Sequence, residues 1–202
     1  DCYAHYEWPA NIGGPAPDAG AVGSFNSKIA AGAASEITVL RCPRRPEYEA
    51  RSLEAIADSR GTSAAEVLRE IERDGGARLL SPIMKPADVR LLFQQPWVMF
   101  ASDGGIALWE GAPERMHIPR DTGTYPRILG RYVREQQWLG MAEAVRKMTG
   151  LPAAHLKLKD RGTIREGAVA DLVLFNPATV RDRSTWLDPA LPPEGIERVI
   201  VN

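Results

Sequence analysis

The residue with the clearest chemical potential is Asp103, which directly follows an apolar run. Residues 97–101, WVMFA, are typical of a fully buried parallel strand, and a polar turn with Gly104 and Gly105 ends the run. Functional side chains gather at the carboxyl ends of such strands. A carboxylate there could carry protons during a reaction, or it could cap the glycine turn, as aspartate often does. The residues alone leave both readings open.

Four other side chains could take part in polar recognition. Arg120 and Arg127 could each clamp a carboxylate, because a planar guanidinium matches that group with two parallel hydrogen bonds, although surface arginines are common. His117 could polarise a carbonyl group or hold Asp103 in place, or it could be an exposed loop histidine. Tyr3 could donate a phenolic hydrogen bond to a bound carboxylate or pack in a core.

The composition restricts the class of protein and its partners. At 202 residues with 44% hydrophobic content, the chain can bury the core of one domain and a small second one. A formal charge of −1 favours neither nucleic acid nor a membrane surface as partner. No apolar run approaches the roughly 20 residues that span a bilayer, and residues 1–20 lack the pattern of a signal peptide. We therefore expect a cytoplasmic protein.

The cysteines and histidines do not form a metal-binding pattern. Cys2 and Cys42 are too far apart for a CxxC clip, and we interpret both as buried thiols. His155 lies between Ala154 and Leu156 on an expected helix and is interpreted as structural. A zinc site needs three or more converging ligands, and the chain has three histidines and no HxH. The sequence therefore predicts no complete metal site.

Several elements must position these side chains. Residues 9–35, rich in glycine, alanine and proline, predict a long irregular loop, and residues 37–42 predict a short strand. A helix over 52–60 should end at Gly61, and Ser63 with Glu66 forms a capping box that opens the next helix. Farther along, we expect helices at 87–95, 124–136, 141–149 and after Pro152, a loop at 106–123, and strands at 170–175 and 197–202.

Several motifs resemble one family. The stretch 162–175, GTIREGAVADLVLF, resembles the closing signature of metal-dependent amidohydrolases. From Trp97 to Asn202 the chain resembles D-aminoacylases, the N-acyl-D-amino-acid deacylases, through SDGG, TGTYPR, GRYVRE and RDRSTW in that order. The beginning, DCYAHY, matches more loosely a late barrel strand of that family.

The resemblance implies an α/β fold. Residues 1–158 would form the C-terminal part of an amidohydrolase (β/α)8 barrel, about its last two strands, with an inserted loop and helical segment. Residues 159–202 would form strands of a small β-sandwich, entered through a tight turn at Gly167. The chain would then be the C-terminal portion of a longer enzyme.

The resemblance also implies a reaction. The enzyme would hydrolyse the amide of N-acyl-D-amino acids, which makes it a hydrolase of carbon–nitrogen bonds other than peptide bonds. Asp103 would be the catalytic carboxylate, and Tyr3, His117, Arg120 and Arg127 would contact the substrate and its α-carboxylate. The complete family enzyme uses zinc, whose ligands come from segments that this sequence lacks. No residue of the chain is therefore predicted as a metal ligand, and the chain by itself is expected to be inactive.

Two alternatives remain. The chain could be a non-catalytic module, because a partial barrel exposes strand edges and side chains such as Val98 and Phe100. Such a module would self-associate or bind a complementary N-terminal chain. It could also be another amidohydrolase of the dihydroorotase or dihydropyrimidinase kind, which shares the sandwich signature but not the TGTYPR and RDRSTW elements.

Overall fold

The chain forms two compact units, which we describe separately. The computed structural model describes residues 7–15, 17–104 and 118–202, with side chains from residue 9 onward. The first unit spans residues 6–85 and the second residues 86–202. The predicted boundary between residues 158 and 159 is not tested by this division and stays a prediction.

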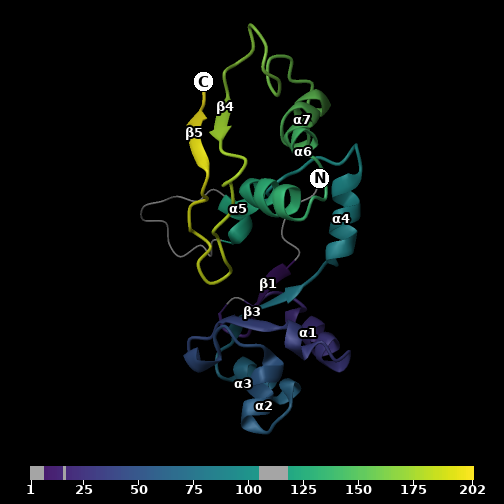
Figure 1. The fold of residues 1–202 in the computed structure, drawn as a ribbon. Helices are drawn as coiled ribbons and strands as arrows, with labels where there is room; N and C mark the ends of the chain where they lie inside the picture. Colours follow the sequence, from purple (N-terminus) through teal and green to yellow (C-terminus); the bar gives the residue numbers. More distant parts are fainter. Residues whose placement is uncertain (1–6, 16, 105–117) are drawn as a thin grey trace. The chain divides into compact units, whose positions relative to one another are not determined.

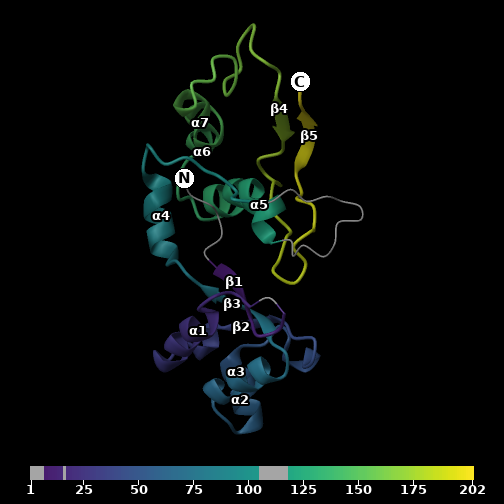
Figure 2. The ribbon, with the colours of Figure 1, turned by 180° about the vertical axis from the view of Figure 1, so that it is seen from behind.

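The first unit is a three-stranded antiparallel sheet with helices (Figures 1 and 2). The order of the strands is β1-β3-β2. Glu7, the first residue of β1, pairs with Pro82, the last residue of β3. The elements are β1 (Glu7–Ile12), α1 (Ala21–Ala30), η1 (Ala34–Glu36), β2 (Thr38–Arg41), η2 (Pro46–Tyr48), α2 (Leu53–Arg60), α3 (Ala64–Arg73) and β3 (Ala77–Pro82).

The ends of the two central helices follow local rules. The hydroxyl oxygens of Ser52 and Ser63 accept hydrogen bonds from the first turns of α2 and α3, which satisfies amide groups that have no partner within the helix. Gly61 ends α2 in the left-handed conformation. The predicted strand at 37–42 and both predicted helices are therefore confirmed.

The first unit has a closed hydrophobic core between the sheet and its helices. Side chains from every layer have no exposed surface: Ile12, Ile37, Val39, Leu53, Ile56, Val67, Leu68, Ile71 and Leu79. Burial of this kind stabilises a fold by roughly 1.5–3 kcal/mol per large side chain. The unit therefore contains its own source of stability.

The prediction of an irregular loop over residues 9–35 was wrong in part. That range contributes most of β1 and the whole of α1. Ile12 and Phe25 bury their side chains in the core. The high glycine and proline content misled the prediction, because packing against the sheet supplies the stability that local propensity lacks.

The second unit is mainly helical and carries a separate strand pair (Figure 1). β4 and β5 pair antiparallel, which confirms the two strands predicted near the end of the chain. The elements are α4 (Pro86–Gln94), α5 (Pro119–Arg127), the π-helix η3 (Ile128–Glu135), α6 (Met141–Met148), α7 (Gly150–His155), β4 (Leu172–Phe175) and β5 (Ile196–Ile200). No helix in the described part of the chain is long and apolar enough to cross a membrane.

An aromatic cluster around a buried lysine holds the helices of this unit together. Phe93 makes edge contacts with Tyr132 and Trp138, whose rings stack 4.3 Å apart. The Lys147 side chain is 1% exposed, and its Nζ donates hydrogen bonds to the carbonyl oxygens of Gln95 and Val98. This lysine ties α6 to the segment that leads to Asp103.

Of the strand predicted over residues 97–101, the structure retains one β-bridge residue, Phe100. All five residues are described, and none belongs to a strand that the structure assigns. Val98 and Phe100 are buried, whereas Trp97 is 68% exposed. The backbone N–H of Phe100 instead donates to the carbonyl of Lys147 on α6. The apolar pattern thus identified burial correctly, but burial occurs against helices.

Candidate active site

Asp103 lies in a tight turn at the end of the buried segment. Its backbone has a φ of 47°, in the left-handed region that only a few residue types, aspartate among them, adopt readily. The N–H of Gly104 donates a hydrogen bond to the hydroxyl of Ser102, 3.1 Å away. The Asp103 side chain is 64% exposed. Its carboxylate is therefore accessible to solvent.

Arg120, on the first turn of α5, contacts this carboxylate. A guanidinium nitrogen of Arg120 lies 2.8 Å from a carboxylate oxygen of Asp103. Arg120 is 8% exposed, so a buried cation meets an accessible anion. The helix packs closely on the turn, since a Cβ placed on Gly104 would lie 3.0 Å from the Cα of Asp121. The structure thus brings together two residues that are 17 positions apart in the sequence.

The start of α5 is held by local and distant hydrogen bonds. The carboxylate of Asp121 accepts a bond from the N–H of Ile118, 3.0 Å away, which caps the helix. The hydroxyl of Thr124 donates to the carbonyl of Arg120 at 3.0 Å. The buried hydroxyl of Ser184 donates to the carbonyl of Pro119 at 3.1 Å. These bonds fix the backbone from which the Arg120 side chain extends.

The segment 181–189, RDRSTWLDP, packs along α5. Asp182 lies 3.4 Å from Nε of Arg127. Burial raises the pKa of the Asp182 carboxyl above its ordinary value, and the charge of Arg127 opposes this effect only in part. A Cβ on Gly123 would lie 2.3 Å from the Ser184 hydroxyl, so a larger residue there would displace the Ser184 side chain. The RDRSTW motif resembles a family, but the sequence carries no signal of its contact with the helix.

The predicted site residues have different outcomes. Tyr3 and His117 lie outside the described residues. Arg120 contacts Asp103 and Arg127 contacts Asp182, so each guanidinium meets a carboxylate of the chain itself. Their predicted role as clamps for a substrate carboxylate is not tested by these contacts and stays a prediction.

The remaining cysteine and histidine predictions concern single residues. Cys42 is buried, as predicted, and burial raises the pKa of its thiol. Cys2 lies outside the described residues. His155 lies exposed at the end of α7.

The described residues do not fit a complete metal site. Within residues 7–15, 17–104 and 118–202, no group of three or more His, Cys, Asp or Glu side chains is placed to hold an ion. A zinc site in a protein takes three or four such ligands. We therefore derive no chemical step through a metal from these residues.

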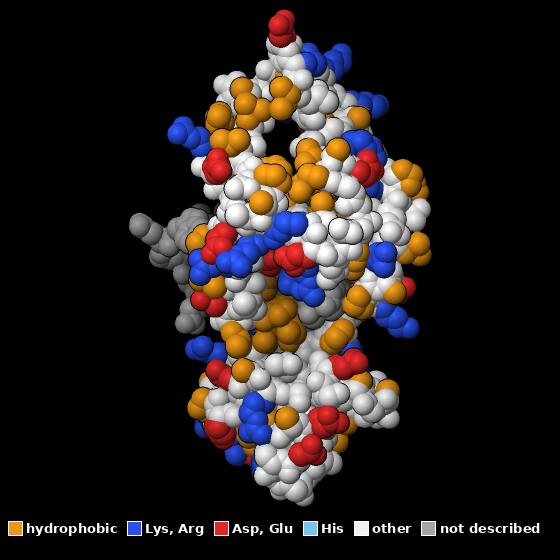
Figure 3. Space-filling view, in the orientation of Figure 1, with side chains coloured by type: hydrophobic (Ala, Val, Ile, Leu, Met, Phe, Trp, Pro, Cys, Tyr) orange, Lys and Arg blue, Asp and Glu red, His pale blue; other side chains and the backbone are white. Residues whose placement is uncertain are grey.

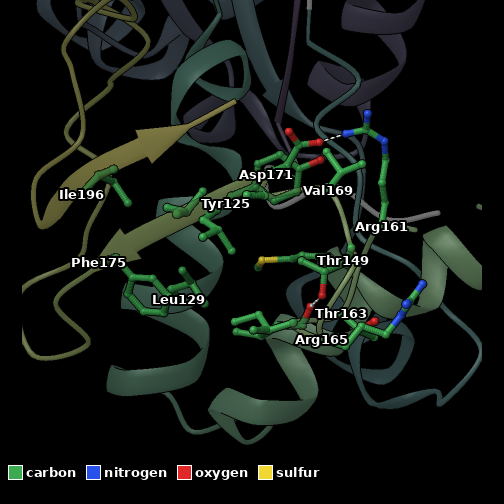
Figure 4. Close-up of a pocket in the computed structure, with 18 of the residues that line it drawn as sticks. Tyr125, Leu129, Thr149, Arg161, Thr163, Arg165, Val169, Asp171, Phe175 and Ile196 are labelled. Carbon is green, nitrogen blue, oxygen red and sulfur yellow. Dashed lines mark hydrogen bonds and ion pairs between the residues drawn. The ribbon is translucent and has the colours of Figure 1, made fainter. Parts of the chain in front are cut away.

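A large pocket of the second unit lies away from Asp103. It has a volume of about 570 Å³ and is lined mostly by apolar side chains of α5, α6 and the chain around β4. Arg161 and Asp171, at its rim, form an ion pair with each other (Figure 4). Neither Asp103 nor Arg120 lines it. This pocket is therefore separate from the turn that carries Asp103.

Comparison with known proteins decides the family. A family model described as amidohydrolase family matches residues 35–202. The chain belongs to the amidohydrolase family. Among curated relatives, this amidohydrolase is 41% identical over 158 residues to an N-acyl-D-glutamate deacylase of Alcaligenes xylosoxydans xylosoxydans, which is 78% of this chain and 30% of the relative. It is 38% identical over 161 residues to a D-aminoacylase of the same organism, covering 80% and 31% of the two chains. The predicted resemblance to D-aminoacylases is confirmed.

Solved structures agree with this assignment. The amidohydrolase matches an N-acyl-D-glutamate deacylase from Bordetella bronchiseptica, complexed with zinc and a phosphonate inhibitor, with a TM-score of 0.67 and 30% identity over 98% of this chain and 37% of that one. It matches a D-aminoacylase with a TM-score of 0.66 and 32% identity, covering 100% and 38%. The chain spans about a third of the length of the curated relatives that it matches.

Proposed function

We propose that the chain supplies the proton-transfer region of an enzyme that hydrolyses N-acyl-D-amino acids to a D-amino acid and a carboxylate. One observation carries the proposal: in a chain whose relatives are deacylases, an accessible carboxylate at Asp103 is held by a buried arginine. Asp182, by contrast, is 13% exposed at its side chain and lies against Arg127 of the chain itself.

Hydrolysis of the amide requires a group that first accepts a proton and then donates it. Water attacks the amide carbonyl carbon, and Asp103 accepts one of its protons as the new carbon–oxygen bond forms. Asp103 then returns this proton to the amide nitrogen, so that the carbon–nitrogen bond breaks and the amine leaves. The second proton of the water stays on the acid product and passes to solvent as the product carboxylate forms, and the Asp103 carboxylate ends the cycle unchanged.

The finer parts of this proposal concern substrate contacts and cofactor. Tyr3, His117, Arg120 and Arg127 are proposed to contact the substrate, the two arginines through its α-carboxylate. Zinc, present in the Bordetella neighbour, is proposed as the cofactor of the complete site, with ligands outside the described residues.

The fold proposal follows the same relatives. We propose that the segment before Asp103 corresponds to the end of an amidohydrolase barrel and that residues 159–202, with β4 and β5, correspond to sandwich strands. Residues 1–158 would then form the barrel part. A location in the cytoplasm stays a prediction. The comparisons do not favour the non-catalytic module or the dihydroorotase-like alternative.

The test measures hydrolysis and zinc content on one sample. The protein is taken as it is encoded, with whatever sequence flanks these residues, and is assayed with N-acetyl-D-glutamate and its L-enantiomer. We expect hydrolysis of the D-enantiomer with stoichiometric zinc, and a loss of at least about 100-fold in kcat for Asp103→Asn. Zinc-loaded protein that hydrolyses neither enantiomer, or an Asp103→Asn variant with full activity, would contradict the proposal.

A matched control separates the chemistry from general damage. Asp160→Asn replaces another carboxylate of the second unit, which is exposed and far from Asp103 in the sequence. This variant should keep wild-type kcat. Equal losses in both variants would point to unfolding and not to a catalytic role.

A further inference from the structure

The buried lysine of α6 contacts the segment that leads to Asp103. The side chain of Lys147 is 1% exposed, and its Nζ lies 3.9 Å from the carboxylate of Glu143 on the same helix. Nζ also donates hydrogen bonds to the carbonyl oxygens of Gln95 and Val98, the second at 3.0 Å. Burial of a charged group is costly unless hydrogen bonds and other charges hold it. An apolar side chain would pack α6 without this cost, so packing alone does not account for a lysine at this position.

The two carbonyl oxygens that Lys147 binds belong to one turn. The N–H of Val98 donates to the carbonyl of Gln95 at 3.2 Å, which closes a four-residue turn over 95–98. Pro96 is the second residue of this turn, a position that its fixed φ favours. The Lys147 ammonium binds the first and the last carbonyl of the turn. It therefore holds the chain at the point where it leaves α4 and runs toward Asp103 (Figures 1 and 2).

The backbone of Lys147 holds the same segment at a further point. Its carbonyl accepts a hydrogen bond from the N–H of Phe100 at 3.1 Å. The Nζ atom lies 5.7 Å from the centre of the Phe100 ring, which in turn lies 4.5 Å from the ring of Phe93 on α4. Phe100 is 4% exposed. One residue of α6 thus contacts the segment before Asp103 through both its side chain and its backbone.

Asp103 follows this anchored segment closely. The three residue steps from Phe100 to Asp103 span at most about 11 Å of chain. A shift of the backbone at Phe100 therefore changes the position of the turn that carries the carboxylate. Misplacement of a catalytic group by about 1 Å can cost about 100-fold in rate.

We propose that Lys147 is a positioning residue, which fixes the location of the Asp103 carboxylate through the backbone of residues 95–100. The inference rests on the proposed function, because it treats Asp103 as the group that carries the proton. In this role Lys147 contacts neither the substrate nor the reacting water. The role is independent of the substrate contact proposed for Arg120, which lies on another helix, α5.

The first test observes Asp103 without any need for turnover. The protein as encoded is labelled with carboxyl-¹³C aspartate, and the Asp103 signal is assigned by its loss in Asp103→Asn. Lys147→Met removes the ammonium but keeps an unbranched side chain, and the Asp103 signal should shift. Lys159→Met is the matched control, because it makes the same substitution at an exposed lysine and should leave the signal in place. An Asp103 signal that is the same in wild type and in folded Lys147→Met overturns the inference.

A second control separates positioning from a general loss of stability. Leu129→Ala truncates a buried side chain that lines the pocket away from Asp103. It should lower the urea midpoint of unfolding, as Lys147→Met does, but leave the Asp103 signal in place. An equal shift of the signal in Leu129→Ala would overturn the inference, because the signal would then report stability alone.

A milder variant is available if Lys147→Met does not fold. Lys147→Gln keeps an amide group that can still donate to one of the two carbonyls. The Asp103 signal should then shift, and the urea midpoint should fall less than in a variant without any donor. An unmoved signal in folded Lys147→Gln would contradict the proposed role.

The second test asks by kinetics whether Lys147 acts through Asp103. Lys147→Met should lower kcat by about 10- to 100-fold with little change in KM. The double variant with Asp103→Asn should have the kcat of Asp103→Asn alone, because residues that act as a unit are not additive. Losses that multiply in the double variant would reject the role. Absence of turnover in wild type would reject the proposed function, whereas the carbon signal would still decide whether Lys147 positions Asp103.

Discussion

Apolar side chains are buried in the core of residues 6–85 but exposed in the strand pair β4–β5. In the first unit, Leu68 and Leu79 have no exposed surface. In the strand pair, Val173 is 56% exposed and Val199 is 64% exposed. Figure 3 shows hydrophobic side chains gathered over β4 and β5 and around an opening beside them. Both regions have strand-forming sequences, but only one has layers that cover them.

The difference shows where stability comes from in this chain. A sheet needs a third strand or a helix against its face, because a two-stranded pair is marginal in water. The first unit meets this requirement with β3 between two partners and helices α2 and α3 on the core. The strand pair, within the described residues, has two strands only. The first unit should therefore be the more stable part, and the strand pair should tolerate substitution.

The largest contrast is expected from truncating one leucine in each region. Leu68→Ala leaves a cavity in a closed core and should lower the free energy of unfolding by about 2–5 kcal/mol. Leu174→Ala, at a position that is 54% exposed, should change it by about 0.5 kcal/mol or less. Urea unfolding of the two variants measures both. Equal losses would show that β4 is covered in solution.

The next effect tests whether the second unit has a core of its own. Lys147→Met removes the charged donor from the carbonyl oxygens of Gln95 and Val98 and should cost about 2–4 kcal/mol. The matched control is Lys159→Met, because the Lys159 side chain is exposed. We expect thermal unfolding to distinguish the two variants clearly. A stable Lys147→Met variant would mean that apolar packing alone holds α6 to the segment before Asp103.

A pH-dependent effect is expected at the junction of α5 and the segment 181–189. Burial raises the pKa of Asp182, so the folded state binds a proton there more readily than the unfolded state. The stability that this carboxyl contributes is fully present below the ordinary aspartate pKa of about 3.9. It is lost as the pH rises through the raised pKa of the folded state.

The measurement compares wild type with Asp182→Asn, which cannot titrate. As the pH falls from 7 toward 4, the difference in free energy of unfolding should change in favour of wild type. Urea midpoints at several pH values give this difference. A difference that stays constant with pH would show that Asp182 is solvated in solution.

The smallest change in stability, but a clear change in association, is expected at β4. Val173→Lys places a charge on an exposed apolar strand and should change the free energy of unfolding by about 0.5 kcal/mol or less. We propose that the exposed strand pair self-associates, and the variant should then show less concentration-dependent association in sedimentation velocity. The control is Ile164→Lys, a residue that is 91% exposed and lies outside the strands. If both variants associate like wild type, the strand pair is not the associating surface.

Local signals in the sequence predicted much of the secondary structure. Ser63 before an amphipathic run identified the start of α3, and Gly61 identified the end of α2. The apolar run LVLF at 172–175, within the stretch that resembles the amidohydrolase signature, predicted β4. These features depend on neighbours within a few positions, which the sequence displays directly.

Local signals could not predict contacts between residues that are distant in the sequence. The pairing of Arg120 with Asp103, and the bond from Ser184 to Pro119, depend on how α5 lies against two other segments. The strand predicted at 97–101 is reduced to a bridge at Phe100 for a related reason, because an apolar run shows that a segment is buried but not against what. Residues 105–117 lie outside the described residues, so the prediction for His117 stays open.

The pairing of β1 with β3 has a consequence for the history of the chain. Glu7 lies opposite Pro82, so the chain enters and leaves the first unit through neighbouring strands. A module whose two ends lie together can be gained, lost or exchanged between relatives at little cost in loop closure, because a short link can replace it. In protein engineering, a foreign domain could replace the first unit by being joined to the chain at residues 6 and 85.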